Sequence, residues 1–242
     1  MIELFSGTPG SGKSLHAAAE IRTRLRQKKC IIIGNFFVNV HAISKIKGTY
    51  IFVPNDRLTP KRLLIFARRY AAHLGRRLKE GELHLYIDEA QLFFNSREWN
   101  NLSRQGWLSF FSQHRHYGYD VFLMAQFDRM LDRQVRCLIE YETIHRKVSR
   151  AGYMGFFVGL FTGDNLYVAI KRWYPLHEKV ESKFFFGGKK IFAIYDSYNH
   201  FEVPGVQAER GKGGPVKTAP QDKENISENV QNLQFESGES KG

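Results

Sequence analysis

The chain begins with MIELFSGTPGSGKS (residues 1–14), and this stretch is the strongest indication of the fold. Ile2 to Phe5 is an apolar run of strand type, and GTPGSGKS at 7–14 satisfies G-x-x-x-x-G-K-[ST], the pattern of a phosphate-binding loop. Residues 13–29 follow with apolar side chains at helical spacing, so the loop lies between a strand and a helix. The alternative is a chance match in a glycine-containing loop, and the flanking strand and helix argue against it.

Each residue type in this loop suits the binding of a nucleotide. The loop comprises Gly7, Thr8, Pro9, Gly10, Ser11 and Gly12, followed by Lys13 and Ser14. Its glycines permit tight turns that aim backbone N–H groups at phosphate oxygens. Lys13 is expected to reach the β- and γ-phosphates, and the Ser14 hydroxyl is expected to bind Mg²⁺. The helix that begins at Lys13 adds the positive end of its dipole.

A second stretch, LHLYIDE at 83–89, is an apolar strand that ends in adjacent carboxylates. In a phosphate-loop NTPase, Asp88 at the strand end would hold Mg²⁺ through water. Glu89 would then be placed to polarise the attacking water as general base. An Asp-Glu pair by itself is more often a solvated helix start, but the upstream loop reverses that preference.

Two further residues are candidates for the same chemistry. Gln126 follows the predicted strand 121–125, and its side chain could contact the γ-phosphate or the lytic water. Arg115 precedes that strand and could stabilise the transition state, within its own subunit or across an interface. A surface or DNA-facing arginine is an equally good interpretation of Arg115. His114 and His116 lack accompanying ligands in the sequence, so no metal other than Mg²⁺ is predicted.

Strands and helices alternate along the first two thirds of the chain, which predicts an α/β fold with a mostly parallel sheet covered by helices on both faces. The predicted strands are Ile2–Phe5, Cys30–Ile33, Tyr50–Val53, Leu83–Ile87 and Val121–Ala125. The predicted helices are 13–29, a helix starting at Thr59-Pro60 and running to Gly81, 97–117 and 129–137.

The last third of the core predicts antiparallel additions to this sheet. The strand-like runs there are Ile139–Val148, Leu166–Trp173 and Ile191–Tyr195. Between them, Ala151 to Phe161 is apolar but far shorter than the ~18–20 residues of a membrane span. Its glycines favour a buried turn between strands. No membrane span and no signal peptide are predicted.

The chain has 242 residues and a formal net charge of +12. Residues 205–242 hold five Lys and Arg against six Asp and Glu and one aromatic residue, so residues 1–204 carry +13. The composition of 205–242 predicts a disordered polar tail, and that of 1–204 a single ATPase-sized domain. Cys30 and Cys137 form no disulfide framework, which suggests a reducing compartment. The excess positive charge indicates an anionic partner.

Together these residues resemble the zonula occludens toxin (Zot) family, the assembly ATPases of filamentous phages. The resemblance rests on residues 1–14, on YIDEAQLFF at 86–94, and on RHYGYD at 115–120 leading into FLMAQ at 122–126. A late pattern, IFAIYDSY at 191–198, is also similar to the family's. The resemblance covers roughly residues 1–200, and the combination of these patterns is more specific than the loop alone.

The resemblance implies a RecA-like (ASCE) ATPase core related to the FtsK–HerA class of DNA pumps, with ATP and Mg²⁺ as cofactors. Lys13 and Ser14 would bind nucleotide and metal, Asp88 and Glu89 would serve hydrolysis, and Gln126 would sense the γ-phosphate. It further implies a location in the cytoplasm of a bacterial host, at the inner membrane, with coat and secretin-like components. Family members usually carry a membrane span after the ATPase domain, so its absence here predicts a separate membrane-anchored partner.

Basic residues cluster at 22–29, 61–79 and 129–136. A homo-oligomer, such as a hexameric ring with a basic pore, would hold single-stranded DNA by sequence-independent contacts. A solvated face or an anionic membrane surface is the alternative for these charges. The leading functional hypothesis is a Mg²⁺-dependent ATPase that powers virion assembly or extrusion of phage single-stranded DNA. The alternatives are a DNA-packaging or conjugation-type translocase, and a nucleotide-binding switch or host-interaction protein with little turnover.

Overall fold

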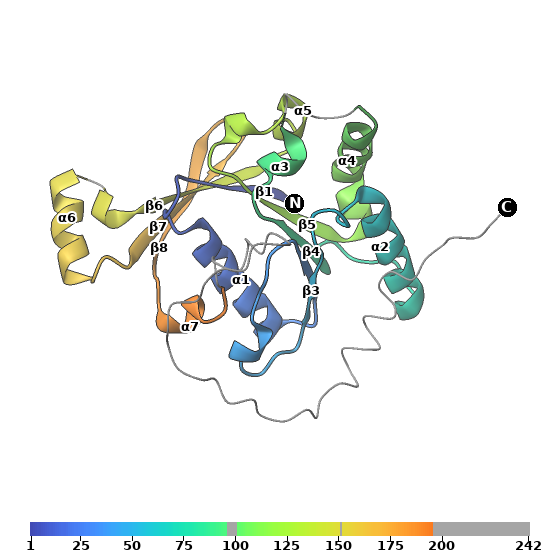
Figure 1. The fold of residues 1–242 in the computed structure, drawn as a ribbon. Coiled ribbons are helices and arrows are strands. Elements are labelled where there is room, and N and C mark those ends of the chain that lie inside the picture. The colour runs from blue at the N-terminus through green and yellow to red at the C-terminus, as the bar shows by residue number, and fades with distance from the viewer. Residues whose placement is uncertain (96–100, 151, 196–242) are drawn as a thin grey trace, which may run out of the picture. The chain divides into compact units, whose positions relative to one another are not determined.

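A computed structural model describes residues 1–95, 101–150 and 152–195 of the chain. Its centre is an eight-stranded sheet with the strand order β3-β2-β4-β5-β1-β6-β7-β8 (Figure 1). The strands are β1 (Ile2–Ser6), β2 (Ile31–Gly34), β3 (Thr49–Phe52), β4 (Leu83–Ile87), β5 (Tyr119–Met124), β6 (Tyr141–Lys147), β7 (Leu166–Trp173) and β8 (Glu178–Phe186). Strands β1 to β6 are parallel, whereas β7 and β8 extend the sheet in antiparallel pairing.

The strand order places the two nucleotide-site stretches close together. One strand, β5, separates β1, which leads into the phosphate-loop sequence, from β4, which ends at Asp88-Glu89. All three strands run in the same direction, so their carboxyl ends meet at one edge of the sheet. Ligands bind at this edge in open α/β sheets. The predicted parallel sheet with antiparallel additions is therefore confirmed.

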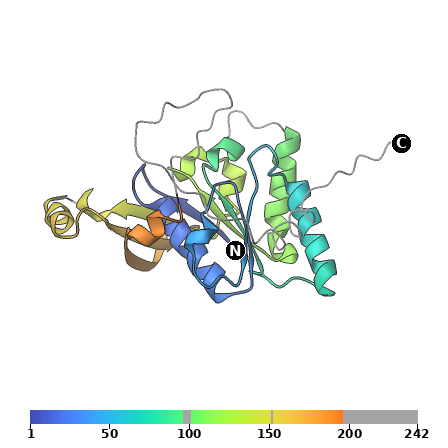
Figure 2. The same ribbon diagram turned by 60° about the horizontal axis from the view of Figure 1, so that its bottom comes forward.

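Helices cover both faces of the sheet, as predicted (Figure 2). They are α1 (Lys13–Gln27), α2 (Pro60–Leu74), α3 (Gln91–Phe94), α4 (Asn101–Gln113), α5 (Arg133–Arg136), α6 (Gly152–Phe161) and α7 (Lys189–Phe192). Short 3₁₀ turns are η1 (Val40–Ala42), η2 (His114–Tyr117), η3 (Asp128–Met130) and η4 (Val148–Arg150). Helices α1 and α7 pack on one face, and α2 to α5 pack on the other.

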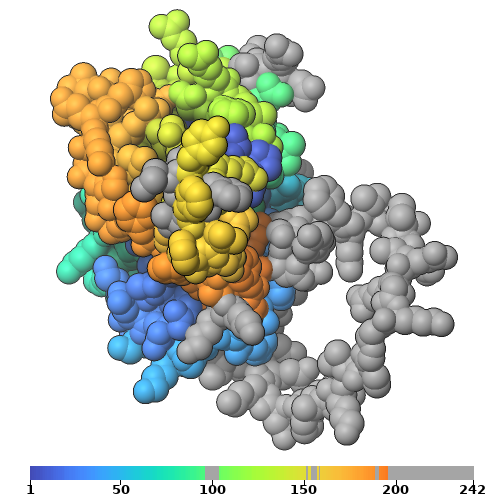
Figure 3. Space-filling model, turned by 90° about the vertical axis from the view of Figure 1, so that its left-hand side faces the viewer, coloured from blue at the N-terminus to red at the C-terminus, as the bar shows by residue number. Residues whose placement is uncertain are grey.

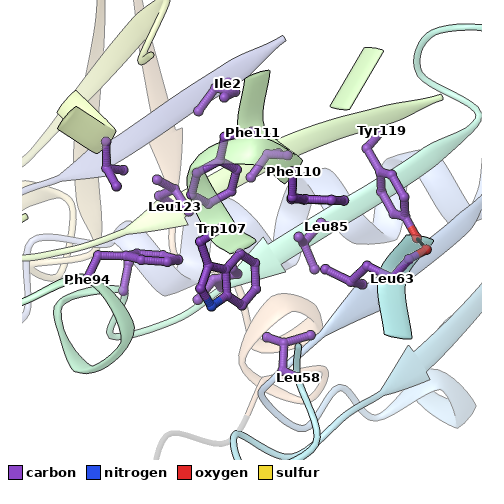
Figure 4. Packing of buried hydrophobic residues seen from close by; sticks show 14 of the residues in the cluster. Ile2, Leu58, Leu63, Leu85, Phe94, Trp107, Phe110, Phe111, Tyr119 and Leu123 are labelled. Atoms are coloured by element: carbon purple, nitrogen blue, oxygen red, sulfur yellow. Dashed lines mark hydrogen bonds between the residues drawn. The ribbon is translucent and has the colours of Figure 1, made fainter. Parts of the chain in front are cut away.

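The larger core lies between α2 to α5 and the sheet. Trp107, Phe110 and Phe111 of α4 point at the strand residues Leu85 and Leu123 (Figure 4). The indole of Trp107 packs edge-on against Phe94 with ring centroids 5.2 Å apart. Such aromatic pairs stabilise a core beyond the area they bury. This core fixes β4 and β5, and with them the residues at their carboxyl ends.

Helix α2 illustrates how local sequence sets the element bounds. Thr59 accepts a hydrogen bond from the Arg62 N–H (3.4 Å), and Pro60 occupies the first helical position. The helix ends at Gly75, whose φ of +64° is left-handed. Its start was predicted correctly, but its end comes before the predicted Gly81 because Gly75 already terminates it.

Several predictions about secondary structure were wrong. Residues 152–161 form the helix α6, in which Tyr153, Phe157, Leu160 and Phe161 are exposed, and not a buried turn. Ile191 lies in the short helix α7, so the predicted strand 191–195 does not form. The predicted helix 129–137 is reduced to η3 and the single turn α5, because Asp132 accepts from the Gln134 N–H and restarts the chain there.

Two further observations concern what the prediction left open. Strand β8 was not predicted, and its charged, exposed sequence explains why. The start of the predicted helix 97–117 and the whole of the predicted tail 205–242 lie outside the described residues. Within the described part of the chain, no helix is both long and apolar enough to cross a membrane.

Candidate nucleotide-binding site

The loop between β1 and α1 has the backbone that its glycines permit. Gly7, Gly10 and Gly12 have φ values of +142°, +71° and +95°. A Cβ at Gly7 would lie 2.5 Å from the His145 carbonyl oxygen, and one at Gly12 would lie 2.7 Å from the Tyr167 ring. A larger residue at either position would therefore clash as well as strain the backbone. The Gly7 N–H donates to the Gln126 carbonyl (3.0 Å), which joins the loop to the end of β5.

Lys13 at the start of α1 bends back over this loop. Its Nζ donates to the Gly7 carbonyl at 2.6 Å. Burial lowers the pKa of Lys13, while the charges of Asp88 and Glu89 raise it. Among the residues that the structure describes, Lys13 forms no ion pair. The ammonium is thus held inside the loop, where an anionic ligand would be its natural partner.

The end of β4 is held by a side chain from the neighbouring strand β2. Asn35, which follows β2, accepts from the Asp88 N–H (2.6 Å) and donates to the Asp88 carbonyl (2.9 Å). The Asp88 side chain in turn accepts from the Glu89 N–H at 2.9 Å. Glu89 has a left-handed φ of +48°, and the Gln91 amide donates to its carboxylate. These bonds fix the direction in which both carboxylates leave the sheet.

Tyr195 brings a distant part of the chain to the same place. Its hydroxyl donates to Asp88 Oδ2 at 3.3 Å and also hydrogen-bonds the Ser14 side chain. Burial and, next, the Asp88 charge raise the pKa of Tyr195. The tyrosine hydroxyl therefore lies between the two side chains predicted to hold the metal. The sequence predicts no role for Tyr195, although it lies within the family-like pattern IFAIYDSY at 191–198.

Two further groups border the loop. Arg150 of η4 donates from Nη1 to the Pro9 carbonyl at 3.1 Å, so the structure brings a guanidinium to the loop that the sequence did not single out. The hydroxyl of Ser11 is buried and has no hydrogen-bond partner among the described residues. A buried hydroxyl without a partner is costly, so a bound group is expected beside it.

A pair of histidines supports the loop from below. His16 Nδ1 and His145 Nε2 are 2.8 Å apart, and His145 Nδ1 lies 3.2 Å from the Ser6 carbonyl. Burial lowers the pKa of His145 to about 3 and also lowers the pKa of His16. The pair is consequently neutral at physiological pH, with one ring donating to the other. It ties β6 to α1 directly beneath Gly7.

Arg115 does not join this site. It lies in η2 at the opposite edge of the sheet, where the parallel strands begin. Its Nη2 is 2.6 Å from Glu140 and its Nε is 3.3 Å from Glu80. Glu80 also contacts the amino group of Met1 at 3.1 Å. A catalytic role for Arg115 in its own subunit has no support in this placement, and a role across an interface stays a prediction.

The predicted magnesium site is chemically suitable for the ion. Mg²⁺ prefers hard oxygen ligands and is usually held by one or two protein groups, with phosphates and water completing its shell. Ser14 and Asp88 supply one hydroxyl and one carboxylate, and Tyr195 already bridges them through a single oxygen. The three-residue cluster of a dedicated protein cage is absent from the described residues. The donor set therefore fits Mg²⁺ bound together with a nucleotide.

The glycine-rich loop lies between β1 and α1, and the paired carboxylates follow β4. Strand β5 lies between β1 and β4. This arrangement defines a P-loop NTPase fold of the RecA type. The family model described as "Zonular occludens toxin (Zot)" matches residues 1–200, so the chain belongs to this family.

Similar proteins agree with this assignment. The chain is 25% identical over 215 residues to the "Gene 1 protein" of Escherichia phage If1 and 26% identical over 211 residues to that of Enterobacteria phage M13. These alignments cover 83% and 81% of this chain but only 59% of each relative, so the chain spans less than two thirds of their length. Among solved structures, the N-terminal domain of zonular occludens toxin from Neisseria meningitidis has the same fold. Its TM-score is 0.51 at 18% identity, covering 81% of this chain and 98% of that one.

Proposed function

We propose that this chain is a Mg²⁺-dependent ATPase whose turnover powers filamentous-phage assembly and the extrusion of single-stranded DNA through the host envelope. The observation that carries the proposal is the convergence of Lys13, Ser14 and Asp88 at one edge of the sheet, with Glu89 next to Asp88. Membership of the Zot family and the likeness to filamentous-phage gene 1 proteins support the phage-assembly part.

In this proposal the loop binds the triphosphate. The backbone N–H groups of residues 7–12 and the α1 N-terminus contact the phosphates, and Lys13 leaves the Gly7 carbonyl to reach them. Ser14 and Asp88 hold Mg²⁺, which would neutralise charge that develops on the phosphates. Arg150 already lies on Pro9, so it supplies a second cation near the loop. Gln126, beside the loop at the end of β5, contacts the terminal phosphate or the lytic water.

Glu89 is the proposed general base. Its carboxylate must lie within hydrogen-bonding reach of the attacking water, and Glu89 directly follows the proposed metal ligand Asp88, with a left-handed φ of +48°. The Gln91 amide holds one carboxylate oxygen, which leaves the other to accept a proton. A base adjacent to the metal ligand favours an enzyme over a nucleotide-binding switch with little turnover.

The proposal is tested by comparing ATP turnover of the wild type, Lys13→Ala and Glu89→Gln, each with and without single-stranded DNA. Glu89→Gln is expected to bind nucleotide normally but to turn over about 10²–10⁴-fold more slowly. Lys13→Ala is expected to lose binding as well. Glu80→Gln is the matched control, because it makes the same change at the opposite edge of the sheet, where Glu80 contacts Met1 and Arg115, and it should leave turnover unchanged. Equal turnover in all variants would refute the catalytic assignment, and indifference to DNA at low ionic strength would refute its coupling to DNA.

A further inference from the structure

Helix α6 exposes an unusual amount of apolar surface. Its sequence, GYMGFFVGLF, contains no charged residue. Tyr153 is 90% exposed, Phe157 57%, Leu160 71% and Phe161 88%. These four side chains recur at a spacing of three or four residues, so they form one stripe along the helix. A surface helix in water normally carries charged residues on its outer face, and the described exposed side chains of α6 are all aromatic or aliphatic.

The base of α6 is anchored to the fold. Gly159 packs so closely on Ser149 of η4 that a Cβ there would lie 2.7 Å from the Ser149 Cβ. Lys147, at the end of β6, forms an ion pair with Asp164, which follows the helix. Helix α6 lies at the end of the molecule farthest from α2 and α4, beyond strands β6 to β8 (Figure 1). In the view onto that end it is the foremost element (Figure 3).

The composition of α6 selects a lipid surface as its partner. A helix that docks on a second protein copy through one stripe normally carries charged residues elsewhere for contact with water, and the sequence of α6 has no charged residue. Ten helical residues extend about 15 Å, half of the ~30 Å hydrocarbon core of a bilayer, so α6 can enter one leaflet without crossing. Tyr153 near the helix start suits the boundary between headgroups and acyl chains.

Charge around the helix is complementary to an anionic membrane. Three basic residues, Arg146, Lys147 and Arg150, lie within six residues of the start of the helix, and Lys147 pairs with Asp164 beyond its end. Arg146 on β6 and Arg150 of η4, which directly precede the helix, are exposed. Basic residues at the base of an apolar helix attract anionic headgroups while the apolar side chains partition into the leaflet.

We propose that α6 is a membrane-inserting helix by which this chain docks directly on an anionic phospholipid surface. The inference is independent of nucleotide hydrolysis and goes beyond the proposed ATPase function. It also changes the expectation that any attachment to the membrane requires a separate anchored partner. Docking of this kind would hold the P-loop edge near the bilayer, because Arg150 of η4, two residues before the helix, contacts Pro9 of the loop.

The test is flotation of the full chain with vesicles of phosphatidylcholine alone and of phosphatidylcholine mixed with phosphatidylglycerol. The wild type is expected to float with the anionic vesicles. Tyr153→Ser/Phe161→Ser is expected to lower the partition coefficient at least about tenfold, because two aromatic side chains no longer leave water. Leu176→Ser/Val180→Ser is the matched control, since it removes two exposed apolar side chains from the β7–β8 hairpin.

A second measurement does not depend on the loss of a side chain. Phe161→Trp should show a blue-shifted emission on anionic vesicles, and brominated lipid should quench it beyond the quenching seen in the wild type. The proposal is overturned if the wild type does not float, if the α6 variant floats like the wild type, or if the control variant loses binding equally. Self-association that depends on α6, seen by sedimentation velocity without vesicle binding, would replace lipid with a second copy as the partner.

Discussion

The two edges of the sheet are both rich in charge, and they use it differently. At the edge where the parallel strands begin, charges neutralise one another: the Met1 amino group contacts Glu80 and Asp120, and Arg115 contacts Glu80 and Glu140. At the edge where the strands end, Lys13 has only the Gly7 carbonyl as its hydrogen-bond acceptor in the described chain.

This difference distinguishes charged groups that hold the fold together from charged groups that remain available to bind a ligand. Ion-paired groups neutralise each other, so little net charge remains to attract a ligand. An ammonium that is partly buried against a carbonyl, as in Lys13, keeps its unit charge available for an anion. The strand ends therefore form the candidate site, and the strand beginnings form a network that holds the N-terminus.

Asn35 holds the strand-end edge through hydrogen bonds and contributes no charge of its own. Asn35→Ala removes both hydrogen bonds to the Asp88 backbone and leaves its N–H without that partner. We expect the free energy of unfolding to fall by about 1–3 kcal/mol. We also expect ATP turnover to fall at least about tenfold, because a misplaced Asp88 and Glu89 misalign the metal and the water. Denaturant unfolding and steady-state turnover measure the two effects.

Asn55→Ala is the control for this variant. Asn55 is exposed, and its side-chain oxygen accepts from the Asn35 amide (2.9 Å), so its loss should change stability by less than about 0.5 kcal/mol. If Asn35→Ala reduced stability but left turnover unchanged, Asn35 would be a purely structural residue. The strand-end edge would then be less finely positioned than its geometry indicates.

The strands of the fold were predictable from the sequence where a short apolar run is bounded by polar residues. The run Leu83–Ile87 formed the predicted strand β4, and the run predicted at Val121–Ala125 lies mostly in β5, which begins earlier, at Tyr119, and ends at Met124. Residues 152–161 were misjudged because glycines suggested a turn, while exposure in a folded chain is a tertiary property that an apolar sequence does not report. Residues 178–186 were missed because an edge strand can carry charges on either face.

The Tyr195 hydroxyl is the uncharged group that contacts both side chains predicted to bind the metal. Tyr195→Phe deletes the hydroxyl that bonds Asp88 and Ser14. Metal binding must break these bonds, which are worth about 0.5–1.5 kcal/mol net each. We therefore expect the Mg²⁺ concentration for half-maximal nucleotide binding to fall about two- to tenfold.

Isothermal titration with a nonhydrolysable nucleotide at several Mg²⁺ concentrations measures this shift. Tyr70→Phe on α2 is the control, since that hydroxyl lies away from the loop and should leave the Mg²⁺ dependence unchanged. A rise in the required Mg²⁺ concentration would show that the Tyr195 hydroxyl supports the metal-bound state, contrary to the expectation.

The candidate site was predictable only where its residues are adjacent in sequence. Gly7 to Ser14 and Asp88-Glu89 form local patterns, so the residue types alone point to phosphate and metal chemistry. Asn35 and Tyr195 reach Asp88 across 53 and 107 residues of chain, and nothing local marks them as its partners. Arg115 shows the converse: its residue type fits catalysis, but only the fold reveals that Glu80 and Glu140 already pair with it.

Arg115→Ala tests whether the strand-beginning edge has only a structural role. Arg115→Ala removes two ion pairs in which the arginine side chain is about half exposed, so we expect a loss below about 1 kcal/mol in the free energy of unfolding. Turnover should stay within about twofold of the wild type, because Arg115 does not approach the loop of its own subunit. A collapse of turnover with unchanged thermal stability would contradict this. Mixing Arg115→Ala with Glu89→Gln would then test for catalysis across an interface: if Arg115 acts on a neighbouring subunit, the mixture regains activity that neither variant has alone.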